Sequence, residues 1–232
     1  MWNDEARELV GAYRMGRCDE IIRREGRKGL YLFSLFNFSD RLLERLGPTV
    51  ELGRSFVRPE YQKSFSPLML LWKGIGAFAA ANPQYRRFVG PVSISNDYSP
   101  ASRALIVSFM NDPARRSPLA SMIQPRTPFS LKRAAKSDVL TMGRALRDVE
   151  ELGDVVGDIE RDGKGVPILL RQYLKLGAKS LGFNVDPEFG YCLDCLTLVD
   201  LLHTDRRTLR KYMGSKQTAA FLSAHEGTEA LE

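Results

Sequence analysis

The sequence lacks the patterns of several protein classes. Among its 232 residues there is no uninterrupted apolar run of about 18 residues, so it predicts no membrane-spanning helix. Its start, Met1 to Glu5, lacks a basic region followed by an apolar run, so we expect no secretory signal there. Only three cysteines occur, and an odd, sparse count is typical of a protein that folds in a reducing cytoplasm.

Several catalytic motifs are also absent. The sequence has no G-x-S-x-G elbow of a serine hydrolase and no G-x-x-x-x-G-K-S/T loop of a P-loop NTPase. Neither of its two histidines, His203 and His225, begins the H-x4-D pair of glycerolipid O-acyltransferases. Cys192 and Cys195 form a C-x-x-C pair, but a zinc site would need a second pair or nearby histidines. We therefore expect no metal site.

The composition, with 44% hydrophobic and 27% charged residues, is that of an ordinary globular protein. The formal net charge is +6, which favours an acidic partner such as nucleic acid, an anionic membrane surface or an acidic carrier protein. Solubility alone is an equally simple explanation of this charge. The basic clusters mostly lack interleaved aromatic residues, so we expect no nucleic-acid partner.

Strand-like segments alternate with amphipathic helices, which predicts a layered α/β domain over residues 1–214. The expected strands cover residues 9–15, 49–57, 87–95, 183–186 and 195–202, with an extended segment at 31–38. The expected helices cover residues 40–46, 66–81, 101–110, 138–152, 167–181 and 205–213, with a loop or short helix at 17–28. We expect a long loop insertion at 111–136 and a flexible tail at 215–232.

The segment 49–57 contains charged residues inside an otherwise core-like strand. Alternation along a strand would send Glu51 and Arg54 to opposite faces. Burying such charges is costly unless they are paired or act on a ligand. Arg14 ends the preceding strand in a similar way. The spacing therefore leaves two interpretations open, a buried glutamate–arginine ion pair that joins two strands and a functional site.

A series of motifs along residues 9–214 resembles the GNAT-like N-acyltransferases. This family includes the acyl-carrier-protein-dependent enzymes that make lyso-ornithine lipids, which are often called hemolysin-like. The motifs are Gly11 to Arg14, Glu51 to Tyr61, Leu71 to Ile75, Gly90 to Ser95, Tyr98 to Ser102, Pro167 to Tyr173, Phe183 to Phe189, Asp194 with Asp200, and Tyr212 to Gly214. The E-x-x-R pair with an upstream arginine is also shared with the related acyl-homoserine lactone synthases.

The resemblance implies a GNAT-like (acyl-CoA N-acyltransferase) mixed sheet flanked by helices. The family has further strands and helices before the segment that Gly11 begins, where this chain has only a short stretch. We therefore expect the N-terminal strands to be lacking. They would be supplied by a missing N-terminal segment, or the chain would depend on a partner such as an O-acyltransferase domain.

The resemblance also implies transfer of a fatty acyl group from a thioester to the amine of an amino acid or an amino lipid head group. An amine attacks only when it is deprotonated, and Glu51 is the expected base. Arg54 and Arg14 would hold Glu51 ionised or bind the acceptor carboxylate. Backbone N–H groups near Val57 and Val92 would stabilise the tetrahedral intermediate.

Four residues are assigned to the binding of the acyl carrier's pantetheine arm, namely Val57, Ser93, Ser95 and Tyr98. Tyr98 is also the expected donor of a proton to the leaving thiolate. Residues 61–67 lack the glycine-rich loop that cradles the pyrophosphate of CoA. This absence favours acyl carrier protein over CoA as the donor, and the basic surface fits an acidic carrier.

We expect no tightly bound cofactor, with acyl-ACP or acyl-CoA as the co-substrate. The expected location is the cytoplasm, at the inner face of the cell membrane, because a fatty product partitions into the bilayer. Two alternatives remain open at this point. One is a CoA-dependent N-acetyltransferase, and the other is a non-catalytic GNAT-like module fused to or assisting a lipid O-acyltransferase.

Overall fold

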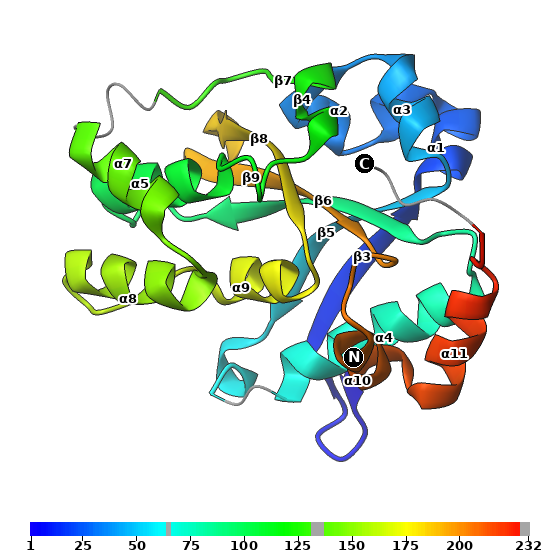
Figure 1. The fold of residues 1–232 in the computed structure, drawn as a ribbon. Helices are drawn as coiled ribbons and strands as arrows, with labels where there is room; N and C mark the ends of the chain where they lie inside the picture. The colour runs from blue at the N-terminus through cyan, green and yellow to red at the C-terminus, as the bar shows by residue number, and fades with distance from the viewer. Residues whose placement is uncertain (64–65, 131–136, 228–232) are drawn as a thin grey trace.

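The computed structural model describes residues 1–63, 66–130 and 137–227, and its centre is a five-stranded mixed sheet (Figure 1). The strand order is β3-β5-β6-β9-β8. The strands are β3 (Gly11–Arg17), β5 (Thr49–Val57), β6 (Arg87–Ile94), β8 (Lys179–Asp186) and β9 (Cys192–Asp200). β5 and β6 run parallel, and every other neighbouring pair in this sheet is antiparallel.

In the described residues, four shorter strands form two small sheets beside the main one. β1 (Trp2–Asn3) pairs with β2 (Glu8–Leu9) near the start of the chain. β4 (Phe36–Phe38) pairs with β7 (Ile123–Pro125), although these strands are far apart in the sequence. The second pair anchors the segment after α5 to the helices that follow β3.

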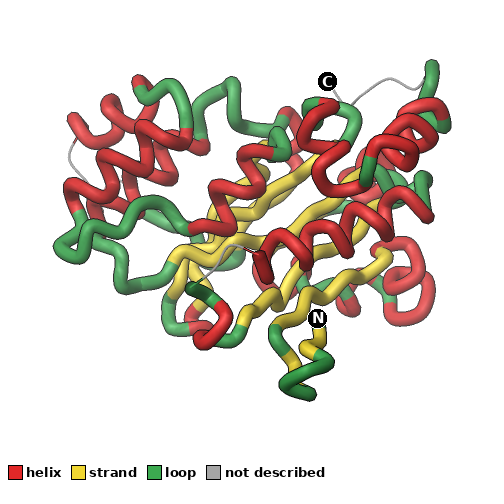
Figure 2. Tube along the Cα trace, turned by 90° about the horizontal axis from the view of Figure 1, so that it is seen from below, coloured by secondary structure: helices red, strands yellow, loops and turns green. Residues whose placement is uncertain are grey.

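Helices cover both faces of the main sheet, and Figure 2 shows strands running behind helices. One face carries α4 (Ser66–Ala81), α5 (Pro100–Met110), α7 (Ser137–Ala145), α8 (Val149–Ile159), α9 (Ile168–Lys175), α10 (Arg206–Met213) and α11 (Ser215–Ser223). The other carries α1 (Cys18–Glu25), α2 (Leu32–Leu35) and α3 (Asp40–Leu46). Short 3-10 helices cover Arg27–Gly29, Pro59–Tyr61, Pro118–Met122 and Pro187–Phe189.

Strand side chains alternate between a larger core under α4 to α11 and a smaller core under α1 to α3. On β6, Phe88 and Val92 belong to the larger core, whereas Val89 belongs to the smaller one. On β9, Val199 faces the larger core and Leu198 the smaller. This period of two explains why the central strands read as continuous apolar runs, since both of their faces are buried.

The parallel strands β5 and β6 pair over only three positions. Thr49, Val50 and Glu51 pair with Arg87, Phe88 and Val89. Beyond this point β5 continues along β3 as far as Val57, and β6 continues along β9 as far as Ile94. Figure 1 shows the two strands diverging. We call the region between residues 53–57 of β5 and residues 91–94 of β6 the wedge.

A bulge in β5 lies where the strands part. Ala12 of β3 pairs with Phe56, whereas Arg14 pairs with Gly53, so β5 holds one extra residue in this stretch. Arg54 has a φ of 49°, in the left-handed region. Because a bulge bends its strand and redirects side chains, it helps to carry the end of β5 away from β6.

Several expected elements are confirmed, including the helix at 40–46 and the strand at 49–57. Others differ. The segment expected to be extended over 31–38 forms α2 before β4, and the helix expected over 138–152 is two helices, because Asp148 caps the start of α8. α9 ends at Lys175, well before residue 181, and Gly182 lies in a bulge of β8 instead of ending a helix.

Two expected irregular segments contain ordered structure. Within the predicted loop 111–136, residues 118–125 form a 3-10 helix and β7, while residues 131–136 lie outside the described part of the chain. Within the predicted flexible tail, Ser215–Ser223 form α11, in which Phe221 is only 1% exposed because it packs into the larger core. Residues 228–232 are not described. In the part of the chain that the structure describes, each helix is too short or too polar to cross a membrane.

Candidate active site

A cavity of about 780 Å³, the polar cavity, opens on the α2 side of the wedge. Both parted strands contribute to its wall, together with residues before and within α2, the segment after β7 and the end of β8. Its lining includes Tyr13, Tyr31, Gly53, Arg54, Ser55, Pro91, Ser93, Arg126, Thr127, Leu169, Asn184, Asp186 and Glu188. Cationic, hydroxyl and carboxylate groups therefore line the same cavity beside the wedge.

A second cavity of about 520 Å³, the entry cavity, lies on the other side of β5, toward the start of α4. It is lined by Ser55, Phe56, Val57, Gln62, Lys63, Leu68, Leu71, Ile168 and Leu169. Ser55 and Leu169 line both cavities. The two cavities therefore approach each other through the wedge.

The backbone of Val57 faces the wedge. The N–H of Arg58, the next residue, donates to the Val10 carbonyl, on the β3 side. Consecutive residues of a strand direct their N–H groups to opposite sides, so the N–H of Val57 points away from β3. The side-chain amide of Gln62 donates to the Val57 carbonyl at 2.7 Å, which closes one wall of the entry cavity.

A third cavity of about 360 Å³, the apolar cavity, lies in the smaller core beneath α1 and α3. Its wall is almost wholly apolar and includes Ile22, Leu30, Leu32, Phe38, Leu42, Leu46, Val89, Ile123, Leu181 and Leu196. Val89 is the last residue of β6 that pairs with β5. The apolar cavity thus lies at the closed end of the wedge, with α2 between it and the polar cavity.

Glu51 forms a buried ion pair with Arg14. The Glu51 side chain is fully buried, and its Oε2 lies 2.9 Å from the Nη1 of Arg14, which is 38% exposed. Its Oε1 accepts a hydrogen bond from the Leu32 backbone N–H at 2.8 Å. Glu51 lines neither of the two cavities that flank the wedge. The geometry is that of an ion pair that joins two strands, with both carboxylate oxygens of Glu51 already engaged. The role of Glu51 as the base stays a prediction.

Arg54 lies beside the polar cavity and away from Glu51's oxygens. Its guanidinium stacks over the ring of Tyr31 at 5.3 Å, on the same side of β5 as Glu51. The expectation that Glu51 and Arg54 point to opposite faces is therefore wrong. The bulge at Arg54 inserts one residue and shifts the alternation of side chains.

Ser93 and Asp194 form a polar pair on the adjacent strands β6 and β9, where they are direct partners. Ser93 lines the polar cavity and is exposed, whereas Asp194 is 1% exposed. The Ser93 hydroxyl donates to Oδ1 of Asp194 at 2.6 Å. Burial raises the pKa of Asp194, the Ser93 hydrogen bond opposes this, and the Asp186 carboxylate raises it further.

Residues 1–73 of the chain match the family model described as an acetyltransferase (GNAT) domain. The match covers β3, β5, the bulge and the start of α4. The mixed sheet with helices on both faces is consistent with the GNAT fold, so the expected α/β fold class is confirmed. No solved structure gave a significant match.

Two curated proteins, each named glycine N(alpha)-acyltransferase, are similar to this chain. The protein of Phocaeicola vulgatus is 29% identical over 201 residues, which cover 82% of this chain and 60% of that protein. The protein of Bacteroides thetaiotaomicron is 29% identical over 219 residues, covering 89% of this chain and 64% of that protein. The chain spans less than two thirds of the length of either relative. Together with the GNAT match, these names support an N-acyltransferase enzyme.

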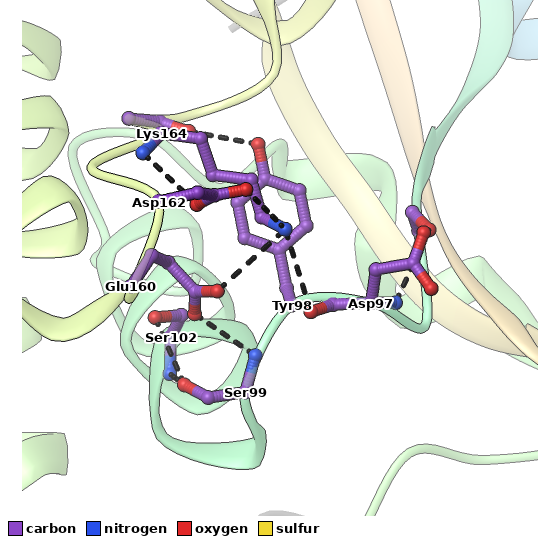
Figure 3. A network of polar contacts seen from close by, with 9 residues as sticks. Asp97, Tyr98, Ser99, Ser102, Glu160, Asp162 and Lys164 are labelled. Carbon is purple, nitrogen blue, oxygen red and sulfur yellow. Dashed lines mark hydrogen bonds and ion pairs between the residues drawn. The ribbon is translucent and has the colours of Figure 1, made fainter.

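Two of the expected carrier-binding residues lie outside the cavities that flank the wedge. Tyr98 is 9% exposed, and its hydroxyl donates to the Gly165 carbonyl at 2.8 Å. Figure 3 shows it in a polar network with Glu160, Asp162 and Lys164, whose ammonium lies 4.8 Å from the ring centre. Burial raises the Tyr98 pKa, and the two acidic residues raise it further. Tyr98 therefore links the start of α5 to the segment between α8 and α9. Its hydroxyl lies away from the wedge, which does not favour Tyr98 as the proton donor to a leaving thiolate.

The other residues expected at the site lie partly in the cavities and partly on the protein surface. Ser95 is exposed and donates to the Asp97 carboxylate at 2.7 Å, outside the polar and entry cavities. Val57 lines the entry cavity and Ser93 lines the polar cavity, so the two residues lie on different sides of the wedge. Their binding of the pantetheine arm stays a prediction. Val92 lies beside them but is wholly buried in the larger core.

The cysteines are buried free thiols. Burial raises the pKa of each of the three, Cys18, Cys192 and Cys195, to about 12. In the described ranges of the chain, no group of three potential metal ligands comes together. Thiols with such a pKa remain protonated at neutral pH and are poor nucleophiles.

Sequence reasoning did not assign roles to Asp194, Asp186 or Tyr31. Asp194 appeared only as part of the GNAT-like resemblance. One signal could have singled it out, because a carboxylate inside the apolar segment Cys192–Asp200 is costly unless it has a task. Its pairing with Ser93 depends on the register of two strands that lie far apart in the sequence.

Proposed function

We propose that this chain transfers an acyl group from a carrier thioester to the amine of an amino acid. The wedge carries this proposal. Two neighbouring strands part after Glu51 and Val89, and the two cavities flanking the wedge approach each other at Ser55 and Leu169. Donor and acceptor can thus reach the same point from opposite sides.

The entry cavity suits the pantetheine arm of the donor. The arm contains amides, and an unpaired strand edge offers N–H and carbonyl groups to such a chain. The Val57 N–H points into the wedge and can bind a pantetheine carbonyl or the oxygen that becomes negative during transfer. Lys63 at the mouth and the net charge of +6 favour an acidic carrier protein as donor.

The polar cavity suits a zwitterionic acceptor. Arg54 and Arg126 supply cations, and both are held over aromatic rings, those of Tyr31 and Phe33. Asp186 and Glu188 supply carboxylates to the same cavity. An amino acid can place its carboxylate at the arginines and its ammonium at the acidic side. The similarity to proteins named for glycine supports a small amino acid as acceptor.

The apolar cavity suits the fatty chain of the donor. Its wall is almost wholly apolar, and burial of methylene groups contributes about 0.8 kcal/mol each. Val89, the last residue of β6 that pairs with β5, lines this cavity, so an acyl chain that passes the closed end of the wedge would enter it. We therefore propose fatty acyl groups as substrates and lipid biosynthesis as the role.

The chemistry proceeds by direct attack. The amine nitrogen attacks the thioester carbonyl carbon, the C–N bond forms, the C–S bond breaks, and the pantetheine thiolate leaves and takes up a proton. No covalent enzyme intermediate is needed. We propose that the reaction takes place in the cytoplasm, beside an anionic membrane surface that receives the fatty product, and that a further segment or an O-acyltransferase domain assists the chain.

The test is product analysis with purified protein. Palmitoyl-ACP, palmitoyl-CoA and acetyl-CoA are each incubated with glycine, ornithine and serine, and N-acyl products are identified by mass spectrometry. We expect N-palmitoyl amino acids, with acyl-ACP as the better donor. Transfer from acetyl-CoA alone would favour a short-chain acetyltransferase. Absence of transfer from every donor would reject the catalytic proposal and favour the non-catalytic module.

A further inference from the structure

We propose that Ser93 contacts the attacking amine and passes its proton to Asp194. This inference rests on the proposed function and extends it to the residues that move the proton. Ser93 would be the catalytic residue at the wedge, and Asp194 would be the positioning residue that orients the hydroxyl of Ser93 and accepts its proton.

The position of Ser93 supports this role. It lies on β6 beyond Val89, on the part of the strand that has left β5, and it lines the polar cavity. Its hydroxyl is already oriented, because it donates to Asp194 at 2.6 Å. The oxygen therefore keeps its lone pairs free to accept a proton from a group in the cavity.

The surroundings of Asp194 support the second half of the inference. Its side chain is almost completely buried, and among the residues that the structure describes none donates to its Oδ2. A buried carboxylate with so few donors is costly, and an asparagine of the same shape would avoid most of that cost. A carboxyl group retained in such a place is therefore a candidate for proton transfer.

Titratable groups on three elements face Asp194. Asp186 on β8 adds a second carboxylate, and Tyr31 before α2 adds a phenol. On β9 the Cys192 thiol donates to Oδ1 of Asp194 at 3.6 Å, and Cys195 adds a further thiol. Burial raises the pKa of Tyr31, and that of Cys192 to about 12, so both stay neutral at pH 7. Arg54 stacks over the ring of Tyr31. The carboxylate form of Asp194 is thus disfavoured, which makes it a stronger base than an exposed aspartate.

The proton balance is complete without another reactant. As the C–N bond forms, the nitrogen loses one proton to the Ser93 oxygen, while the Ser93 hydroxyl proton passes to Asp194. Asp194 becomes neutral, and the leaving thiolate removes the same proton when the C–S bond breaks. The pair returns to its starting state.

The experiment compares Asp194→Asn, Ser93→Ala and the double variant by kcat/KM against pH. We expect each single variant to lose about 100-fold at pH 7, within the range typical of general base catalysis, and the double variant to be no worse. The wild type should show a rising limb as Asp194 ionises, and Asp194→Asn should lack that limb. Asp97→Asn is the matched control, because Asp97 accepts a hydrogen bond from the Ser95 hydroxyl outside both cavities. Its kcat/KM and pH profile should equal those of the wild type.

Stability measurements separate loss of fold from loss of proton transfer. The folded protein raises the pKa of Asp194 above its ordinary value of 3.8. The stability that this shift contributes is present below that pKa and is lost as pH rises through the folded pKa. The asparagine of Asp194→Asn does not ionise, so the variant does not lose stability as pH rises. At pH 7 its free energy of unfolding should therefore lie no more than about 1 kcal/mol below that of the wild type.

Unchanged kcat/KM and an unchanged pH limb in Asp194→Asn would overturn the inference while the proposed function stands. Activity losses that multiply in the double variant would also overturn it, because they would show that the two residues act separately. A wild type that transfers no acyl group from any donor would reject the proposed function, and the inference with it.

Discussion

At the scale of single residues, charge inside this protein is compensated by a few specific partners. Glu51 is the clearest case, because each of its oxygens has one partner, the Arg14 guanidinium or the Leu32 N–H. These two contacts join β3, β5 and the start of α2 at one point. The buried Glu51 carboxylate stabilises the local structure only as long as the Arg14 guanidinium and the Leu32 N–H both remain in place.

We predict that Glu51→Ala destabilises the fold by about 3 kcal/mol, because it leaves the Arg14 charge and the Leu32 N–H without their partner. Urea unfolding, followed by fluorescence of the two tryptophans, measures this loss. The control is Glu151→Ala, which removes the solvent-exposed Glu151–Arg147 ion pair and should cost much less stability than Glu51→Ala. A Glu51→Ala protein of unchanged stability and abolished activity would instead favour Glu51 as the catalytic base.

Single residues also show which contacts can be predicted from the sequence and which cannot. The spacing of Arg14 and Glu51 on two expected strands was enough to predict an ion pair as one of two interpretations. The pairing of Ser93 with Asp194 was not accessible, because about 100 residues separate them and strand register is set by packing of the whole sheet.

At the scale of elements, the site depends on the parting of two parallel strands. Gly90 stands at the first position of β6 after the last pair, and a Cβ there would lie 2.3 Å from the Leu52 carbonyl oxygen. The close approach of β6 to β5 at this point therefore needs glycine. The strands separate only beyond it.

We predict that Gly90→Ala destabilises the protein by about 2 kcal/mol, because the new methyl group meets backbone that cannot move without opening the sheet. Thermal or urea unfolding measures the change. Gly74→Ala in α4 is the control, since a Cβ there meets nothing within 4 Å and should add about 0.5–1 kcal/mol of helix stability. Equal effects of the two substitutions would contradict the close approach of the strands.

The apolar cavity is a second feature of this scale, since it is enclosed by α1, α2 and α3 against the sheet. We predict that Leu42→Trp, which fills part of it, shifts donor preference from palmitoyl toward octanoyl groups. Competition between acyl-ACPs of different chain length measures the shift as a ratio of kcat/KM values. Leu70→Trp, at a half-exposed position on α4, should leave the ratio unchanged. An unchanged ratio in Leu42→Trp would place the acyl chain elsewhere.

At the scale of the whole molecule, the net charge bears on the proposed association with an acidic carrier protein. The chain carries 34 Lys and Arg against 28 Asp and Glu residues. We predict that raising the salt from 50 to 500 mM increases KM for palmitoyl-ACP about tenfold with little change in kcat, because screening weakens attraction to an acidic carrier. Steady-state kinetics at several salt concentrations check this. A salt-independent KM would reject the electrostatic role of the carrier.

The sequence alone determined the local elements and the general architecture. Alternating apolar residues, capping residues such as Ser99 and breaks at proline and glycine act within a few positions, so strands such as β5 and helices such as α3 could be predicted closely. The GNAT-like motifs then indicated how these elements combine.

Only the tertiary structure decided which side chains surround the wedge. A single extra residue in β5 moved Arg54 to the side of Tyr31 and Glu51, and the antiparallel register of β6 and β9 brought Ser93 to Asp194. Neither effect has a local signal, because a bulge and a strand register depend on the packing of distant segments against both faces of the sheet. The chemistry of the site therefore emerges from the assembled sheet, although its strands can be recognised one at a time.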